Sequence, residues 1–213
     1  QLATDRIPPL VAPPVDLDGI SPELTGWGDP AAHLRAALSN DELQLFVQPI
    51  LRLSGENDFP MAETLVRLRE EEQKLLPPGE FLPAFEHCRM MPALDRWVVR
   101  NVIDSLSRPP AQGMTLTINI SSQTIEDVNF LPYVAGELVR REVDAKAICF
   151  EIDEVDTLDR PEAAAKFAIT ARRFGCRVLI DGFGRRSVTF NALTALQASL
   201  VKVDGSIVRR ILT

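Results

Sequence analysis

The stretch Arg177-Val-Leu-Ile-Asp-Gly-Phe-Gly184 is the most informative part of this sequence. Its apolar run, 178–180, is bounded by glycines, which is typical of a short strand buried on both faces of a parallel sheet. The run ends at Asp181, and a carboxylate at the end of a barrel strand lies at the rim where β/α folds place their chemistry. The glycines that follow allow the backbone to turn tightly beside a ligand. Asp181 is therefore the first candidate functional residue.

The composition indicates an ordinary globular domain that is acidic overall. The chain has 213 residues, 46% of them hydrophobic and 25% charged, which is enough to bury one sizeable core. A net charge of −7 argues against a broad basic face for DNA, so phosphates would be bound by a few cations or metal ions. No apolar run reaches the roughly 18 residues of a membrane span. The widely spaced cysteines favour buried thiols in a reducing compartment, so we expect a cytoplasmic protein.

The domain is expected to cover residues 29–213, after a proline-rich linker or arm at 1–28. Asp29 and Pro30 are suited to begin a helix that Asn40 ends. The strands predicted after it are Leu43–Leu51, Met61–Leu68, Thr115–Ile120, Ala147–Ile152, Arg177–Ile180 and Leu200–Val203. The further predicted helices are Glu80–His87, Ala93–Leu106, Pro132–Arg141, Pro161–Phe174, Val188–Leu196 and one that opens near Ser206.

The alternation of strands and helices predicts an α/β fold, a parallel sheet covered by helices as in a TIM-like (β/α) barrel. A complete eightfold barrel takes about 250 residues. This chain is therefore expected to stop about two strand and helix units before such a barrel closes. Because Gln1 is not a natural start, the chain is interpreted as part of a longer protein.

Oxygen-bearing side chains lie near the ends of four predicted strands, and a lysine and an acid end the last one: Glu63, Asn119, Glu151, Asp181, Lys202 and Asp204. Barrel strands bring their carboxyl ends to one rim, so residues far apart in the sequence can converge there. Carboxylate and amide oxygens suit Mg²⁺ or Mn²⁺ better than zinc or copper. Any one of these residues alone is explained as a helix cap or loop polar group. The set in register favours a metal site.

Eight short segments then follow one another in a known order: Leu45-Phe46-Val47-Gln48-Pro49, Glu63-Thr64-Leu65-Val66-Arg67, Pro78-Gly79-Glu80-Phe81-Leu82-Pro83, Leu94-Asp95-Arg96-Trp97-Val98, Asn119-Ile120-Ser121, Phe150-Glu151-Ile152-Asp153-Glu154, Asp181-Gly182-Phe183-Gly184 and Val201-Lys202-Val203-Asp204. From about Asp41 to its end, the chain resembles the EAL domains, which hydrolyse or bind cyclic di-GMP. The resemblance implies an EAL-type barrel.

The resemblance also implies roles for individual residues. It implies that one metal is held by Glu63, Asn119, Glu151 and Asp181. It implies that Lys202 holds the attacking water and that Glu154 braces the loop after the fifth strand. It implies that Arg67 binds a phosphate, and that a guanine or its ribose phosphate is contacted by Gln48, Leu65, Phe81 and Asp95. An active enzyme of this type uses two metals to activate water and stabilise the leaving oxygen.

The sequence departs from the family at the fifth strand. The family motif has two consecutive aspartates, whereas here the second position is Gly182, which cannot coordinate a metal. The loop that follows, 184–189, is also rewritten. Its Arg185 and Arg186 are explained either as replacements for the lost metal that reach a phosphate or as a solvated loop, and we favour the solvated loop. The chain also ends before the family's later catalytic glutamate and its guanine-contacting glutamine.

We therefore expect a degenerate EAL domain that binds cyclic di-GMP as a receptor or regulatory module, with little or no hydrolysis. It would hold Mg²⁺ or Mn²⁺ at one site at most. Two alternatives stay open: an active Mg²⁺- or Mn²⁺-dependent phosphodiesterase, and a protein interaction domain that no longer binds the nucleotide. The expected partners are cyclic di-GMP and an upstream regulatory domain or partner protein, and a homodimer is left open.

Overall fold

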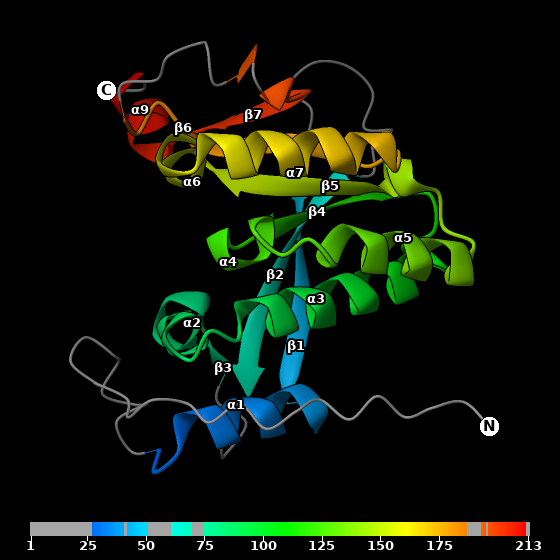
Figure 1. Ribbon diagram of the computed structural model, residues 1–213, viewed down its shortest axis with the longest axis vertical. Coiled ribbons are helices and arrows are strands. Elements are labelled where there is room, and N and C mark those ends of the chain that lie inside the picture. The colour runs from blue at the N-terminus through cyan, green and yellow to red at the C-terminus, as the bar shows by residue number, and fades with distance from the viewer. Residues whose placement is uncertain are drawn as a thin grey trace.

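The computed structural model describes residues 27–40, 42–50, 61–69, 75–186, 193–194 and 196–211. Its centre is a seven-stranded sheet (Figure 1). The strands are β1 (Leu43–Ile50), β2 (Met61–Arg69), β3 (Leu75–Leu76), β4 (Thr115–Ile120), β5 (Ile148–Asp153), β6 (Arg177–Phe183) and β7 (Leu200–Val203). Their order across the sheet is β1-β2-β4-β5-β6-β7, and β3 pairs with β2 outside this path.

The sheet is parallel from β2 to β7, and β1 joins it antiparallel to β2. In Figure 1, β1 and β2 run steeply while β5, β6 and β7 lie across them, so the sheet is strongly twisted. Such a twist is the normal right-handed rotation between neighbouring strands, accumulated over many of them. Among the described residues β1 and β7 form the two edges of the sheet. The architecture is that of an incomplete TIM-like barrel.

The helices are α1 (Pro30–Ser39), α2 (Pro78–His87), α3 (Met91–Leu106), α4 (Ser122–Ile125), α5 (Phe130–Arg141), the 3₁₀ helix η3 (Ala145–Ala147), α6 (Glu154–Asp159), α7 (Pro161–Arg173) and α9 (Gly205–Ile211). Helix α1 begins as its sequence predicts, because Asp29 accepts a hydrogen bond from the Ala32 amide at 2.9 Å. Figure 1 shows α3, α5 and α7 side by side across one face of the sheet. None of the helices described is both long enough and apolar enough to span a bilayer.

The core lies between this helical layer and the sheet. Phe150 on β5 packs edge-on against Phe167 on α7 and Phe130 on α5, with ring centroids 5.5 and 6.1 Å apart. These aromatic side chains are buried, and each removes a large apolar area from water. The apolar residues of β4 and β5 that point toward the helices are also buried. This packing fixes the central strands and hence the side chains at their carboxyl ends.

The predicted α/β fold is confirmed, but several boundaries differ. Strand β6 continues to Phe183, so Asp181 lies inside a strand that was expected to end before it. Glu63 lies near the start of β2, although it was expected at the strand's end. The sequence also gave no sign of β3, α4 or α6, which are short. The predicted linker up to residue 26 and the start of the predicted helix Val188–Leu196 lie outside the described residues.

Candidate functional site

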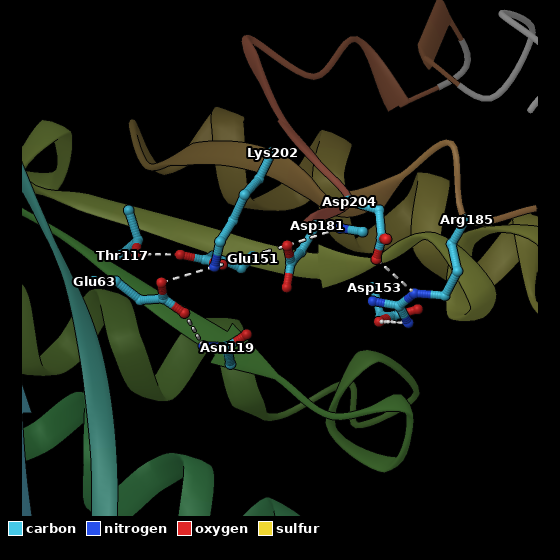
Figure 2. A network of polar contacts seen from close by, with 10 residues as sticks. Glu63, Thr117, Asn119, Glu151, Asp153, Asp181, Arg185, Lys202 and Asp204 are labelled. Carbon is cyan, nitrogen blue, oxygen red and sulfur yellow. Dashed lines mark hydrogen bonds and ion pairs between the residues drawn. The ribbon is translucent and has the colours of Figure 1, made fainter. Parts of the chain in front are cut away.

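Three acids from three strands converge on one amine at the rim of the sheet (Figure 2). The Nζ atom of Lys202 lies 2.7 Å from Oε2 of Glu63, 3.2 Å from Oε2 of Glu151 and 3.7 Å from Oδ1 of Asp181. The amide of Asn119 donates to Oε1 of Glu63 at 3.4 Å. The structure therefore brings together all four residues expected to hold a metal, with Lys202 among them.

Strand register explains this convergence. Asn119 on β4 lies beside Glu151 on β5, and Glu63 on β2 lies beside Thr117 on β4. Residues two apart on a strand point to the same face of the sheet, so these side chains share one face. Asp181 shares this face, because it lies two residues after Leu179, which pairs with Glu151, and the pairing of β6 with β7 shifts register around it, between Ile180 and Phe183. A local irregularity of this kind re-aims side chains, and it is common next to functional sites.

Glu151 is the most deeply buried acid of the cluster, with 1% of its side chain exposed. Burial raises its pKa, and the charge of Glu63 raises it further. The hydroxyl of Thr117, which donates to Oε1, and the ammonium of Lys202 act against this rise. A buried carboxylate held between a fixed donor and a cation is suited to stay in one orientation.

Lys202 carries the positive charge of the cluster. Partial burial alone would lower its pKa. The hydrogen bond to Glu63 and the charges of Glu151 and Asp181 outweigh that effect, so the net pKa is raised. The amine thus stays protonated and balances one of the three negative charges around it.

The donor set fits one hard divalent cation. Its oxygens come from three carboxylates and an amide, the ligands that Mg²⁺ and Mn²⁺ prefer, and they already gather around a single positive atom. In the present geometry the acids point to Lys202, and within the described residues no three His, Cys, Asp or Glu side chains take up metal-binding positions. A bound cation would therefore displace the ammonium from part of its carboxylate contacts.

The loop after β6 is held by Glu154, at the start of α6. Its Oε1 accepts from the Gly184 amide at 3.0 Å, and its Oε2 accepts from the Arg186 amide at 2.9 Å. The carboxylate is buried, so both of its oxygens are satisfied inside the protein. Glu154 therefore ties the end of β5 to the loop beside Asp181.

Arg185 lies in this loop between two acids that sequence reasoning did not connect with it. Its Nη1 lies 3.1 Å from Oδ2 of Asp153, and its Nε lies 3.1 Å from Oδ2 of Asp204. Bonds from Ser206 and then from Arg185 lower the pKa of Asp204 to about 2. Arg186 pairs with Asp159 at 3.3 Å. Both arginine side chains are about half exposed, at 46% and 53%, as expected of a solvated loop, but their pairing with these acids was not predicted from the sequence.

The residues expected to contact the nucleotide fall into two groups. On the sheet, Gln48 on β1 is exposed and lies opposite Glu63 in the antiparallel register. Leu65 and Arg67 on β2 are half-buried, and Arg67 donates to the carbonyl of Val66 at 2.8 Å. Alternation along β2 puts all of these side chains on the face that carries the metal-type acids. They border the cluster on its β1 side.

The other two expected contact residues are buried. Phe81 on α2 is 0% exposed and packs edge-on against Phe85, so it presents no surface to a ligand in this conformation. Asp95 on α3 accepts from the amide and the hydroxyl of Ser121, at 3.1 and 2.8 Å. Burial raises the pKa of Asp95 to about 6, although these hydrogen bonds oppose the rise. As placed, Asp95 joins α3 to the loop after β4.

A family model and several curated relatives match most of this chain. The family model described as "EAL domain" matches residues 31–213. Cyclic di-GMP phosphodiesterase PdeB of Shewanella oneidensis is 26% identical over 183 residues, which are 85% of this chain and 21% of that protein. Cyclic di-GMP phosphodiesterase PdeF of Escherichia coli is also 26% identical, over 85% of this chain and 24% of its own length. The chain thus spans less than a third of these curated relatives.

Solved structures resemble the chain over most of its length. The FimX EAL domain from Pseudomonas aeruginosa bound to c-di-GMP superposes with a TM-score of 0.81 and 29% identity, covering 87% of this chain and 75% of that one. A second FimX EAL domain structure gives a TM-score of 0.79 and 30% identity, with 88% and 76% covered. The rim that carries the acid cluster thus belongs to a fold for which a cyclic dinucleotide complex is known.

Proposed function

The chain belongs to the EAL-domain family, and from this premise we propose that it is a cyclic di-GMP receptor module with little or no hydrolysis. The observation that carries the proposal is a complete first cluster next to an incomplete second one. Glu63, Glu151 and Asp181 gather at one point, whereas the position after Asp181 is Gly182, which has no side chain to bind a cation. In this proposal, binding of the nucleotide needs only the first cluster, whereas two-metal hydrolysis needs both.

The ligand is an anion, so the site must supply positive charge. Arg67, on the same face of β2 as Glu63, would bind one phosphate through a charge-assisted hydrogen bond. One Mg²⁺ or Mn²⁺ held at the rim of the sheet by Glu63, Asn119, Glu151 and Asp181 would supply further positive charge. The exposed Gln48 offers an amide beside them. The c-di-GMP complex of the related FimX domain supports this choice of ligand.

A second function, hydrolysis of cyclic di-GMP, is favoured by the names of the curated relatives, several of which are phosphodiesterases. Lys202 contacts two acids of the cluster within hydrogen-bond distance, and in this function it would orient a water beside a metal held there. Two-metal hydrolysis also needs a ligand for a second cation, to stabilise the attacking and leaving oxygens. Gly182 supplies none, and we therefore favour the receptor.

Calorimetry with cyclic di-GMP, in EDTA and in Mg²⁺, tests the proposal. The parent should bind in at least one condition, and Arg67→Ala should bind about 10- to 100-fold more weakly, since a charge-assisted phosphate contact contributes about 1.5–3 kcal/mol. Arg108→Ala is the matched control, because Arg108 pairs with Asp104 on α3. Equal affinity of Arg67→Ala and parent would show that the phosphate site is elsewhere.

Hydrolysis is measured on the same samples by chromatography of the nucleotide. We expect no linear product, or only traces, in Mg²⁺ or Mn²⁺. Brisk turnover by the parent would overturn the receptor assignment and establish the phosphodiesterase. Absence of binding in both conditions would instead favour the interaction domain.

A further inference from the structure

Arg185 joins the carboxyl ends of three neighbouring strands. Its two ion pairs reach Asp153, the last residue of β5, and Asp204, the residue after β7, while its own loop follows β6. Figure 2 shows the guanidinium between the two carboxylates, on the far side of Asp181 from Glu63. A planar cation with several fixed donors is well suited to hold two carboxylates at once.

The same guanidinium fills the space that a side chain at position 182 would need. A Cβ atom built on Gly182 would lie 2.5 Å from Nη2 and 2.9 Å from Cζ of Arg185. Both distances are shorter than any normal carbon contact. Gly182 also has a φ of +68°, in the left-handed region that glycine adopts most easily. In this conformation the guanidinium occupies the space beside Gly182, and a side chain at 182 would require the end of the Arg185 side chain to move.

This arrangement does not fit a second divalent cation beside Asp181. Position 182 has no ligand to offer, and the two acids on either side of the loop, Asp153 and Asp204, are already paired with a guanidinium. We propose that Arg185 is a built-in cation that takes the place of a second metal ion on the Gly182 side of Asp181. Unlike a metal, this cation cannot bind water or a leaving oxygen as a ligand, and it cannot be removed by a chelator.

The inference deepens the proposed receptor function, yet it is tested by counting metal ions without any nucleotide. Mn²⁺ binding is followed by the loss of the free-ion signal in electron paramagnetic resonance. We expect at most about one ion per chain for the parent and no additional ion for Gly182→Asp, because Asp153 and Asp204 stay paired with Arg185. This single variant should also have a lower melting temperature, since the positive φ at position 182 strains any side chain there. The double variant Gly182→Asp with Arg185→Ala should bind about one ion more than the parent, because it frees two acids and adds a third.

Arg186→Ala is the matched control. It removes the same charge from the same loop, but its partner is Asp159, away from Gly182. It should leave the ion count unchanged, alone or combined with Gly182→Asp. The proposal is overturned if the parent binds two ions, if Gly182→Asp alone gains one without loss of stability, or if the folded double variant gains none. Nucleotide affinity plays no part in these counts, so they are independent of the proposed function.

Discussion

The ammonium of Lys202 and the carboxylate of Glu151 form an ion pair, 3.2 Å from Nζ to Oε2, in which the acid is 1% exposed and the amine 40% exposed. The buried partner cannot recover its solvation if the amine is lost, whereas the amine can partly turn to water. Glu63 and Asp181 contact the same ammonium. Lys202 is therefore the countercharge of the metal-free cluster, and a divalent cation would compete for its role.

Lys202→Met should destabilise the metal-free protein. In EDTA we expect the free energy of unfolding to fall by about 1–2 kcal/mol, less than for a fully buried pair because water screens the amine. Mg²⁺ or Mn²⁺ should restore part of this loss by binding where the ammonium was. Urea unfolding with and without the metal measures both effects.

Two other variants test whether this effect is specific to the countercharge. Lys166→Met, on the exposed face of α7, should leave stability unchanged in both conditions. Glu63→Gln should leave stability in EDTA unchanged or raise it, because it relieves repulsion among the acids, while it weakens Mn²⁺ binding. A Lys202→Met protein as stable as the parent in EDTA would contradict the countercharge role, and a large loss in Glu63→Gln would favour a purely structural cluster.

The fold could be predicted from the sequence because its central strands are short apolar runs separated by amphipathic helices. The run Val178–Ile180 and the apolar residues of the run 148–152 are buried as their composition predicts. Element ends were less certain, since β6 passes through Asp181 and Gly182 before it stops. No local pattern indicates this continuation, because it depends on pairing with β7, which lies about twenty residues further along the chain.

The acid cluster could also be predicted, because neighbouring parallel strands bring these residues to one rim, although Glu63 lies near the start of β2 and not at its end. The pairing of Arg185 could not. To predict it, one must know that Asp153 and Asp204 lie on either side of the loop. One must also know that Gly182, which has no side chain, leaves room for the guanidinium between them. A clue was present in the sequence, since Gly182 and two arginines appear together in one short segment. Charge alone did not distinguish a paired arginine from a solvated one.

Glu154→Gln should loosen the loop after β6. The glutamine keeps one acceptor oxygen, but its NH₂ group faces an amide that needs an acceptor, so one buried hydrogen bond is lost at a cost of about 1–3 kcal/mol. Hydrogen exchange at the Gly184 and Arg186 amides should become faster, while exchange in β5 stays slow. Asp159→Asn, which loses only the surface pair with Arg186, is the control. Unchanged exchange in Glu154→Gln would show that the loop is held by other contacts.

Asp95 should make stability depend on pH in a direction opposite to that of most acids. Burial raises its pKa to about 6 from an ordinary value of 3.8, so between these values the folded state binds the proton more tightly than the unfolded state. Stability should therefore be highest below this window and fall as the pH rises through it. Asp95→Asn removes the titration while its oxygen still accepts from Ser121.

We therefore expect Asp95→Asn to remove this fall, and to equal or exceed the parent at pH 7 by up to about 3 kcal/mol, since each pKa unit corresponds to about 1.4 kcal/mol. Urea unfolding in EDTA from pH 4 to 7 measures the difference between the two proteins. Asp29→Asn, which exchanges one good helix cap for another, is the control and should keep the fall in stability seen in the parent. If Asp95→Asn and the parent show the same slope, Asp95 is ionised in the fold at no cost, and its two bonds to Ser121 offset its burial completely.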